Sequence, residues 1–279
     1  MRAVFFVLLT LVTFKVQASH CQLPRGQKLI VGCTYKCDFT YRFRLQLAAV
    51  KLGYKIEIQD ISQRSSVDEA LSKIDGLLVP GGADIDPRYY LDDVTPELAD
   101  YVRSRLHLVN FSSEGEKRDP FEHEILSRYS EDDQYSNLPL LGICRGMQMM
   151  TVVQGIPLYL DIKTELGIPN RMRKLDRIYV GSDSSAMQNL YGDSSFLGFK
   201  LHHQGLRVPY FNEHRNKYPL LKITATSNDG RIAEAIEYTH RPAVGVQYHP
   251  EKSFSRAAYP VLTWFLNKSC ENKMSKDSL

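Results

Sequence analysis

The segment Gly142-Ile143-Cys144-Arg145-Gly146 holds the residue of this chain best suited to covalent chemistry. An apolar run from Leu138 to Cys144 predicts a strand, and Arg145 to Gln154 predicts a helix that follows without a loop. Such a turn is sterically tight and needs glycine on either side, because neighbouring backbone must approach closely. The helix start supplies N–H groups that favour a thiolate and can hold a developing oxyanion. This cysteine counterpart of the nucleophile elbow predicts Cys144 as a nucleophile. Taken alone, the string also fits a buried cysteine at a strand end.

A second segment, Gly245 to Glu251, ends a late apolar run in His-Pro-Glu. On an extended chain residues i and i+2 project to the same side, so His249 and Glu251 can converge, although Pro250 leaves the local shape open. An activated thiol needs a base and a group that orients the base. A lone His-Pro-Glu is more typical of a surface turn, but the elbow earlier in the chain favours a Cys–His–Glu triad.

Strand and helix patterns alternate in the first part of the chain. This alternation predicts βαβ units, a mostly parallel central sheet and a three-layer α/β sandwich. The expected strands are Lys28 to Tyr35, Tyr54 to Ile61, Gly76 to Val79 and Leu138 to Cys144. The expected helices are Thr40 to Leu52, Ser66 to Ile74, Pro96 to Leu108 in a loop-rich stretch, Asp119 to Tyr129, and Arg145 to Gln154.

The pattern changes from Leu220 onward, where short strands are separated by turns. The runs Leu221 to Ser227, Ala233 to Tyr238 and Ala243 to His249 predict a meander or an antiparallel edge to the sheet. A last helix is expected over Arg256 to Asn267. The chain has no internal repeat and no low-complexity linker, which favours one domain over 19–279.

Composition excludes some classes of function. Of the 279 residues 43% are hydrophobic and 24% are charged, and the formal net charge is +3 with both signs mixed along the chain. A phosphate backbone selects a concentrated basic stripe, which this sequence lacks. We therefore expect no nucleic-acid partner.

The N-terminus has the pattern of a secretory signal. Arg2 precedes an apolar run from Ala3 to Phe14, and Val16-Gln17-Ala18 suits a cleavage site. Lys15 ends the run well short of the roughly 20 apolar residues that a membrane span needs. We predict a signal peptide over 1–18 and a mature protein that is secreted, periplasmic or lumenal; the alternative is a retained anchor. No later stretch is apolar enough to cross a bilayer.

Five cysteines fit an oxidising compartment. If Cys144 is a working thiol, four remain, enough for two disulfides whose connectivity the sequence leaves open. Unpaired buried thiols are the alternative. The Cys33–Cys37 spacing lacks a second cysteine or histidine pair, so we expect no zinc site. Two sequons, at Asn110 and Asn267, matter only in a host that glycosylates.

These motifs together resemble the class I glutamine amidotransferase superfamily, and within it the γ-glutamyl hydrolase-like cysteine peptidases. The Gly-Ile-Cys-Arg-Gly form is most similar to the γ-glutamyl-γ-aminobutyrate hydrolases. The resemblance extends from Lys28 to about Phe265. Its motifs are Pro80-Gly81-Gly82-Ala83-Asp84-Ile85-Asp86-Pro87, Arg118-Asp119-Pro120-Phe121-Glu122, Gly142 to Gln148, His202-His203-Gln204, and Gly245 to Glu251.

The resemblance implies a flavodoxin-like fold and a set of site residues. Cys144, His249 and Glu251 would form the triad, Gly82 lies where the family places a second oxyanion donor, and Gln148 would line the glutamyl pocket. His202 and His203, with Gln204, would lie in the cleft or serve only as structural residues. Asp84 and Asp86 would either contact substrate or shape a turn.

Arg145 is unusual for its position. A cation in the first turn of a helix opposes the helix dipole. Its side chain is therefore expected either to be solvated or to bind an anionic group, and in the second case it belongs to the substrate-binding set.

Three departures from the family pattern leave the leaving-group side of the substrate open. Lys200 stands where the family usually has serine, Ile156 and Pro157 replace the second glycine and its neighbour after Gly155, and Leu160 replaces a common glutamine. All are expected near the cleft.

The resemblance and the residues together predict hydrolysis of a γ-glutamyl amide bond through a thioester on Cys144. The expected partner is a small γ-glutamyl substrate, with no metal or cofactor, and a homodimer is compatible with the sequence. Two alternatives stay open. The chain could be a glutaminase-type subunit that supplies ammonia to a partner, or a non-catalytic binding protein on the same scaffold.

Overall fold

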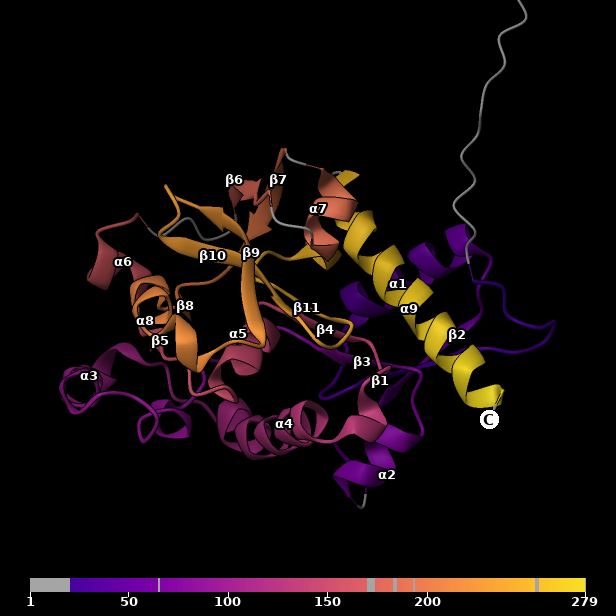
Figure 1. Ribbon diagram of the computed structural model, residues 1–279, viewed down its shortest axis with the longest axis horizontal. Helices are drawn as coiled ribbons and strands as arrows, with labels where there is room; N and C mark the ends of the chain where they lie inside the picture. Colours follow the sequence, from indigo (N-terminus) through magenta and orange to yellow (C-terminus); the bar gives the residue numbers. More distant parts are fainter. Residues whose placement is uncertain are drawn as a thin grey trace, which may run out of the picture.

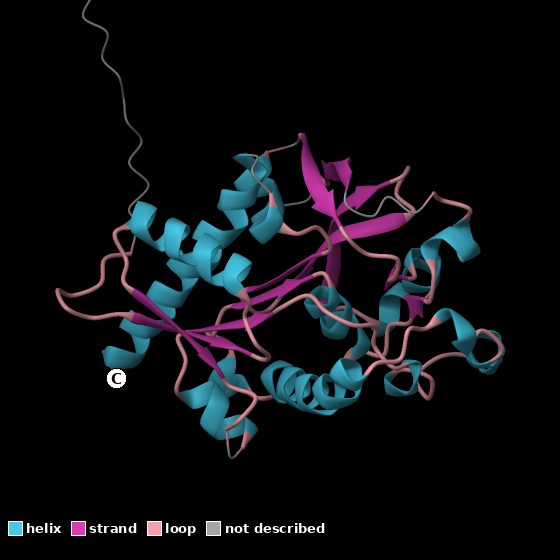
Figure 2. Ribbon diagram, turned by 180° about the vertical axis from the view of Figure 1, so that it is seen from behind, coloured by secondary structure: helices cyan, strands magenta, loops and turns pink. Residues whose placement is uncertain are grey.

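The structure, a computed structural model, describes residues 21–64, 66–169, 174–182, 185–192, 194–253 and 256–278 (Figure 1). The predicted signal segment and its cleavage after Ala18 lie outside these residues. A large twisted sheet lies at the centre, with helices on both of its faces (Figure 2). This arrangement is the predicted three-layer α/β sandwich.

The central sheet has nine strands among the described residues, in the order β2-β1-β3-β4-β11-β10-β9-β6-β7. Neighbours are parallel from β2 to β11 and antiparallel beyond it. Since only β10 and β6 run against the other strands, the sheet is mostly parallel, as predicted. The strands are β1 (Leu29–Cys33), β2 (Ile56–Asp60), β3 (Gly76–Val79), β4 (Leu140–Ile143), β6 (Lys174–Val180), β7 (Ser195–Lys200), β9 (Leu221–Ser227), β10 (Ile232–Tyr238) and β11 (Ala243–Val246), with β5 (Leu158–Tyr159) and β8 (Gly205–Leu206) as a separate pair.

Helices α1, α7 and α9 cover one face of the sheet, and α2, α4 and α5 cover the other (Figures 1 and 2). Helices α3, α6 and α8 lie near the β5–β8 pair (Figure 1). The bounds are α1 (Phe39–Leu52), α2 (Val67–Ser72), α3 (Pro96–Arg103), α4 (Ser113–Glu131), α5 (Arg145–Val152), α6 (Ile162–Leu166), α7 (Ala186–Tyr191), α8 (Val208–Glu213) and α9 (Tyr259–Asp277). Short 3-10 turns are η1 (Pro87–Tyr89), η2 (Leu106–Leu108), η3 (Asp133–Tyr135), η4 (Arg215–Lys217), η5 (Pro250–Lys252) and η6 (Arg256–Ala258).

The core has two apolar layers because both faces of the parallel strands are buried. On β3, Leu77 packs in the layer that contains Leu71 of α2, whereas Leu78 packs with Leu45 of α1 and Phe265 of α9. Alternate strand residues point to opposite faces, so each short strand supplies both layers. This pattern explains why the first strands appear as continuous apolar runs.

Three helices differ by several residues from the sequence prediction. Helix α3 ends at Arg103 and not at the expected Leu108, which belongs to the separate turn η2. Helix α4 begins six residues before the expected Asp119, because Ser112 caps it by accepting a hydrogen bond from the N–H of Gly115 (3.2 Å). Pro120 therefore lies inside the helix rather than at its start. Helix α9 continues past the expected Asn267 to Asp277, since one of its faces stays buried as far as Asn272.

The meander predicted from Leu220 onward is present, and β11 joins it to β4 in parallel register. It does not end the sheet, because β6 and β7 extend the antiparallel part beyond β9. The sequence analysis assigned no elements between Gln154 and Leu220, where the structure has β5 to β8 and α6 to α8.

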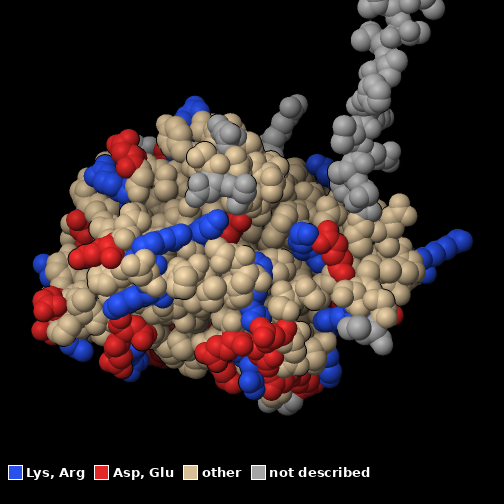
Figure 3. Space-filling model, in the orientation of Figure 1, with Lys and Arg blue, Asp and Glu red and all other residues tan. Residues whose placement is uncertain are grey.

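Four of the five cysteines form two disulfides, and the fifth is free. Cys21 bonds to Cys270 and Cys33 to Cys37, while Cys144 is a buried free thiol. The two-disulfide prediction is thus confirmed, and the alternative of several unpaired thiols is wrong. No helix in the described ranges is both long and apolar enough to span a membrane. On the face shown in Figure 3, basic and acidic side chains are interspersed.

Candidate active site

The elbow between β4 and α5 has the predicted geometry. Cys144 adopts φ 54° and ψ −106°, a left-handed conformation that is rare for a residue with a side chain and is typical of strained functional turns. A Cβ on Gly142 would lie 2.8 Å from the carbonyl carbon of Gly146, and one on Gly146 would lie 2.1 Å from the carbonyl oxygen of Val79. Both glycines are therefore required by close backbone packing.

His249 and Glu251 converge as the sequence predicts, but by a different local structure. Nδ1 of His249 lies 2.6 Å from Oε1 of Glu251, and both side chains are buried. Strand β11 ends at Val246 rather than at His249, and Glu251 belongs to the 3-10 turn η5. The convergence thus comes from a tight turn at Pro250 and not from an extended chain.

The other ring nitrogen of His249, Nε2, is buried and has no hydrogen-bond partner among the described residues. The imidazole ring interacts electrostatically with the side chain of Cys144. Burial alone would lower the pKa of His249, but the sulfur of Cys144 and the carboxylate of Glu251 raise this pKa to about 10. His249 is therefore a cation at neutral pH when it faces a thiolate, which is the charge pair that an activated cysteine requires.

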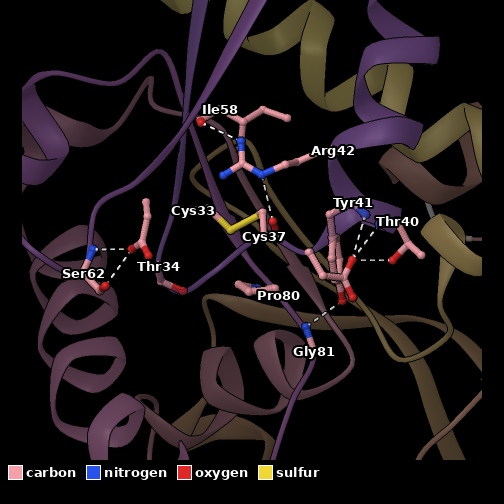
Figure 4. The surroundings of a disulfide bond; sticks show 12 residues. Cys33, Thr34, Cys37, Thr40, Tyr41, Arg42, Ile58, Ser62, Pro80 and Gly81 are labelled. Atoms are coloured by element: carbon pink, nitrogen blue, oxygen red, sulfur yellow. Dashed lines mark hydrogen bonds between the residues drawn. A yellow bond between two sulfur atoms is a disulfide. The ribbon is translucent and has the colours of Figure 1, made fainter.

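Two backbone amides, those of Arg145 and Gly82, are the candidates to hold an oxyanion. The first hydrogen bond of α5 runs from the N–H of Gln148 to the carbonyl of Cys144 (3.1 Å), so the N–H of Arg145 precedes the helical bonds. On the opposite loop, the N–H of Gly81 donates to the hydroxyl of Tyr41 (2.9 Å; Figure 4). Gly82 is exposed, and its amide is the next one along that loop.

The side chain of Arg145 does not contact solvent, which corrects one expectation. Its guanidinium is fully buried and forms ion pairs with Asp119 and Glu122 of α4. The anionic groups that it binds are therefore carboxylates of the protein, and not a substrate. Burial and the nearby Arg118 lower the pKa of Arg145 to about 9, which leaves it charged at neutral pH.

Gln148 lies in a group of buried polar side chains. Its Nε2 donates to the carbonyl of Gln204 (3.0 Å) and contacts Oε1 of Gln247 (3.3 Å). In this group several polar atoms are buried without a hydrogen-bond partner among the described residues. They are Nε2 and Oε1 of Gln204, Nε2 of Gln247 and Nε2 of His202. Burial and the nearby Lys200 lower the pKa of His202 to about 3, so its ring is neutral. Unpaired buried groups of this kind are costly and suit a site that binds a polar ligand.

His203 bridges two carboxylates at the other side of the Pro80–Gly82 loop. Its Nε2 lies 2.9 Å from Oδ1 of Asp84, and its Nδ1 lies 3.3 Å from Oδ2 of Asp161. Asp84 also accepts the N–H of Asn110 (2.8 Å), and Asp86 caps η1 by accepting the N–H of Arg88. Asp86 thus shapes a turn, whereas Asp84 joins three loops.

The departures from the family pattern separate into two groups. Ile156 and Leu160 are fully buried and pack in one layer of the core. Lys200 is buried in ion pairs with Asp176 and Glu234. It borders a pocket whose lining includes Lys163, Asp176, Lys200, His202, His203 and Asn228.

Sequence reasoning missed Tyr41 as a site residue. In the sequence it is one of several aromatic residues at helical spacing, and such residues usually pack in the core. Its contact with Gly81 depends on the tertiary position of α1. Gln247 and Arg118 stood in quoted motifs, but nothing in the sequence gave them a role.

The chain is similar to several known proteins. The chain is 29% identical over 205 residues to protein NtpR of Enterococcus hirae, which covers 70% of this chain and 74% of that protein. It is 25% identical over 211 residues to the γ-glutamyl-γ-aminobutyrate hydrolase PuuD of Escherichia coli K12, covering 71% and 72% of the two chains. Among solved structures, the glutaminase domain of Trypanosoma brucei CTPS with bound acivicin superposes with a TM-score of 0.60 at 17% identity, covering 88% of this chain and 94% of that one.

The structural likeness places the fold with the class I glutamine amidotransferases. The model of the Peptidase C26 family matches residues 43–251, a span that contains the elbow, the histidine pair and the His-Pro-Glu turn. The chain belongs to the Peptidase C26 family.

Proposed function

We propose that this protein hydrolyses γ-glutamyl amide bonds through a γ-glutamyl thioester on Cys144. Family membership and the relatives support a γ-glutamyl hydrolase or amidotransferase type of function. The observation that carries the finer proposal is the arrangement at the elbow, where a strained Cys144 faces a buried His249 that Glu251 orients.

In this mechanism the thiolate of Cys144 attacks the γ-carbonyl carbon of the substrate. The carbonyl oxygen becomes an oxyanion that the amides of Gly82 and Arg145 stabilise. His249 gives its proton to the leaving amine as the C–N bond breaks, which leaves the thioester and a neutral imidazole. His249 then takes a proton from water, the hydroxide attacks the thioester, and glutamate leaves as the thiolate is restored.

The group of buried amides around Gln148 is the proposed site for the free end of the glutamyl group. A γ-linked glutamate keeps its α-amine and α-carboxylate, and both need polar partners. Gln204, Gln247 and the neutral His202 supply unpaired donors and acceptors. A site built to pair polar groups rejects ligands that lack them by roughly 10⁴-fold. We expect γ-Glu-X to be cleaved and α-Glu-X to be untouched.

We further propose that the protein acts outside the cytosol. The N-terminal pattern motivates this, and two disulfides in the fold are typical of oxidising compartments. The test is the mass of the protein purified from its host. A start at Ser19 with Cys144 as the one alkylatable thiol supports export, whereas an unprocessed N-terminus contradicts it.

The deciding experiment uses purified protein with paired γ-Glu-X and α-Glu-X dipeptides and γ-glutamyl amines. Cys144→Ala should remove turnover while the unfolding midpoint stays close to that of wild type. Mass spectrometry of a quenched reaction should find a glutamyl adduct on Cys144. Turnover in Cys144→Ala, or equal rates on α- and γ-linked substrates, would refute the proposal.

Hydrolysis of glutamine itself is the second candidate, because the fold is shared with a glutaminase domain. Ammonia release from glutamine, measured beside the amine release above, separates the two. A glutaminase should prefer glutamine to every substituted γ-glutamyl amide.

A further inference from the structure

A cluster of charged side chains, most of them buried, links the elbow to α4. We call it the α4 charge cluster; its members are Glu114, Arg118, Asp119 and Glu122 of α4 together with Arg145 of α5. Glu122 and the Arg145 guanidinium are fully buried, and the Arg118 side chain is 1% exposed. Burying such charges costs free energy that ion pairing often fails to recover, so stability alone explains the cluster poorly.

Arg118 holds the loop that carries Gly82. Its Nη2 donates to the carbonyl of Pro80 (2.8 Å) and its Nη1 to the carbonyl of Gly81 (2.9 Å). A Cβ on Gly82 would lie 2.0 Å from Nη1, so glycine is needed for the guanidinium to lie this close to the loop. The arginine thus contacts two consecutive peptide groups at once, which a planar fork of donors can do.

These two contacts determine where the amides of the loop point. In a trans peptide the C=O and the following N–H point in opposite directions. The Pro80 carbonyl faces Arg118, and the Gly81 N–H on the other side donates to Tyr41. By the same geometry the Gly81 carbonyl faces Arg118 and the Gly82 N–H points away from it. A Cβ on Gly81 would lie 3.5 Å from Cβ of Cys144 and 3.1 Å from Cε1 of His249, so this loop borders the nucleophile.

Glu122 links this loop to the elbow. Its Oε1 accepts from Nε and Nη2 of Arg118 (3.0 and 2.9 Å), and its Oε2 accepts from Arg145. Thr34, just after β1, donates to the same Oε1 (2.7 Å). Arg145 is also the residue whose amide follows Cys144. One carboxylate therefore fixes both segments that carry the oxyanion donors.

We propose that Arg118 is a positioning residue that orients the Gly82 amide toward the oxyanion, and that Glu122 sets this amide at a fixed distance from the amide of Arg145. The inference rests on the proposed acyl transfer at Cys144. It predicts that disturbing Arg118 impairs the formation of a tetrahedral oxyanion and leaves the nucleophilicity of the thiolate intact.

The test compares two reactions of Cys144 in Arg118→Lys. Acylation by p-nitrophenyl acetate passes through an oxyanion, whereas alkylation by iodoacetamide displaces iodide at a saturated carbon and forms none. Lysine keeps the charge, but all its donors lie on one nitrogen, so it cannot reproduce the planar fork with which three nitrogens of Arg118 reach both carbonyls and Glu122. We expect the acylation rate, and kcat on a γ-glutamyl amide, to fall by roughly 100-fold, with KM and the alkylation rate within about threefold of wild type.

Gly82→Ala provides a second variant on an exposed loop, in case Arg118→Lys does not fold. Its methyl group must displace the Arg118 guanidinium, so the same selective loss of acylation is expected. The matched control is Arg128→Lys on the same helix, because Arg128 is about half exposed and pairs only with Asp68 in the described residues. This control should behave as wild type in every assay.

An unchanged acylation rate in either folded variant would overturn the inference. A fall in the alkylation rate that matches the fall in acylation would also overturn it, because it would indicate a damaged thiolate–histidine pair. The ester needs no glutamyl recognition. If wild type cleaves no γ-glutamyl amide but is acylated by the ester, the proposed function fails while the test of Arg118 still stands.

Discussion

The two disulfides restrain very different lengths of chain. Cys21–Cys270 joins residues 249 positions apart and ties the start of the described chain to α9, whereas Cys33–Cys37 closes a loop of four positions after β1. In the chain-entropy model the long loop stabilises the folded state by about 5 kcal/mol and the short one by about 2 kcal/mol. Entropy alone thus explains the first bond much better than the second.

The short disulfide lies among residues that shape the active site (Figure 4). Within its loop Thr34 donates to Glu122. Directly after the loop, Asp38 caps α1 by accepting hydrogen bonds from the N–H groups of Thr40 and Tyr41. Tyr41 in turn holds the Gly81 amide. One disulfide therefore stabilises the whole chain, and the other fixes a few residues next to the nucleophile.

The largest effect is expected from removing the long disulfide. Cys21→Ser with Cys270→Ser should lower the free energy of unfolding by about 5 kcal/mol, because the unfolded chain regains the entropy of a large loop. The activity per folded molecule should stay at the wild-type level. Urea unfolding and kcat at a temperature well below the midpoint measure the two quantities. A large loss of kcat in the folded variant would contradict the division of roles.

Removal of the short disulfide should have the opposite effect, a small loss of stability and a clear loss of activity. Cys33→Ser with Cys37→Ser should cost only about 2 kcal/mol of stability. The loop that positions Thr34 and Tyr41 loses its restraint, so kcat should fall by roughly tenfold, about 1.4 kcal/mol of transition-state stabilisation. The same urea and kinetic assays apply. Wild-type kcat here would mean that α1 and its cap hold Tyr41 without the disulfide.

Tyr41→Phe removes one hydrogen bond, the one between the Tyr41 hydroxyl of α1 and the Gly81 amide. The hydroxyl accepts the Gly81 N–H, and burial with the Glu251 carboxylate nearby raises the pKa of Tyr41 well above its usual value, so it keeps its proton. Loss of one such hydrogen bond is worth about 1 kcal/mol, and we expect kcat to fall roughly fivefold. Steady-state kinetics measures this fall. A double mutant with the Cys33/Cys37 pair should be less than additive if the disulfide acts through Tyr41.

The smallest effect is expected from the ion pairs of His203 with Asp84 and Asp161. Unlike the two disulfides, these ion pairs depend on pH. Hydrogen bonds to Asp84 and then Asp161 raise the pKa of His203 above its ordinary 6.5, although burial opposes this. Burial would raise the pKa of Asp161, but hydrogen bonds from Thr164 and His203 lower it below 3.8. The unfolded His203 loses its proton first, so its contribution is complete below about pH 6.5 and disappears as pH rises through the folded pKa.

The Asp161 contribution has the opposite sign and is lost as the pH falls through its lowered pKa. His203→Asn should therefore cost less than about 1 kcal/mol near pH 6, since the bridge is partly exposed and screened. The cost should fall as the pH rises through the raised pKa of the folded His203. Unfolding free energies of both proteins across this range measure it; a cost that is independent of pH would refute the ion-pair account.

The sequence predicted the elbow because its cause is local. Gly142 and Gly146 are demanded by contacts within one turn and with the adjacent strand, so their spacing around Cys144 carries the information. The first strands and α1 were predictable for a similar reason, since apolar runs and the Gly53 cap act over a few residues.

Other features depend on partners far along the chain. Arg145 opposes the dipole of its own helix, and only the carboxylates of Asp119 and Glu122 explain its burial. The start of α4 was misplaced at Asp119, whose acidic side chain suits a first turn, whereas the cap at Ser112 sets it. Strands β6 and β7 have seven and six residues, but they mix exposed and buried positions and pair mainly with each other, so no single segment marked them.

The Cys21–Cys270 bond has a mechanical consequence. It makes the chain between these two residues a covalent ring that contains the whole central sheet. Force applied between a point before Cys21 and a point after Cys270 passes through the disulfide and does not load the strands. For the same reason a single cut in a surface loop, such as the turn at Asn228-Asp229-Gly230, cannot release a fragment. Pulling or nicking would separate the sheet only after the sulfur–sulfur bond had been reduced.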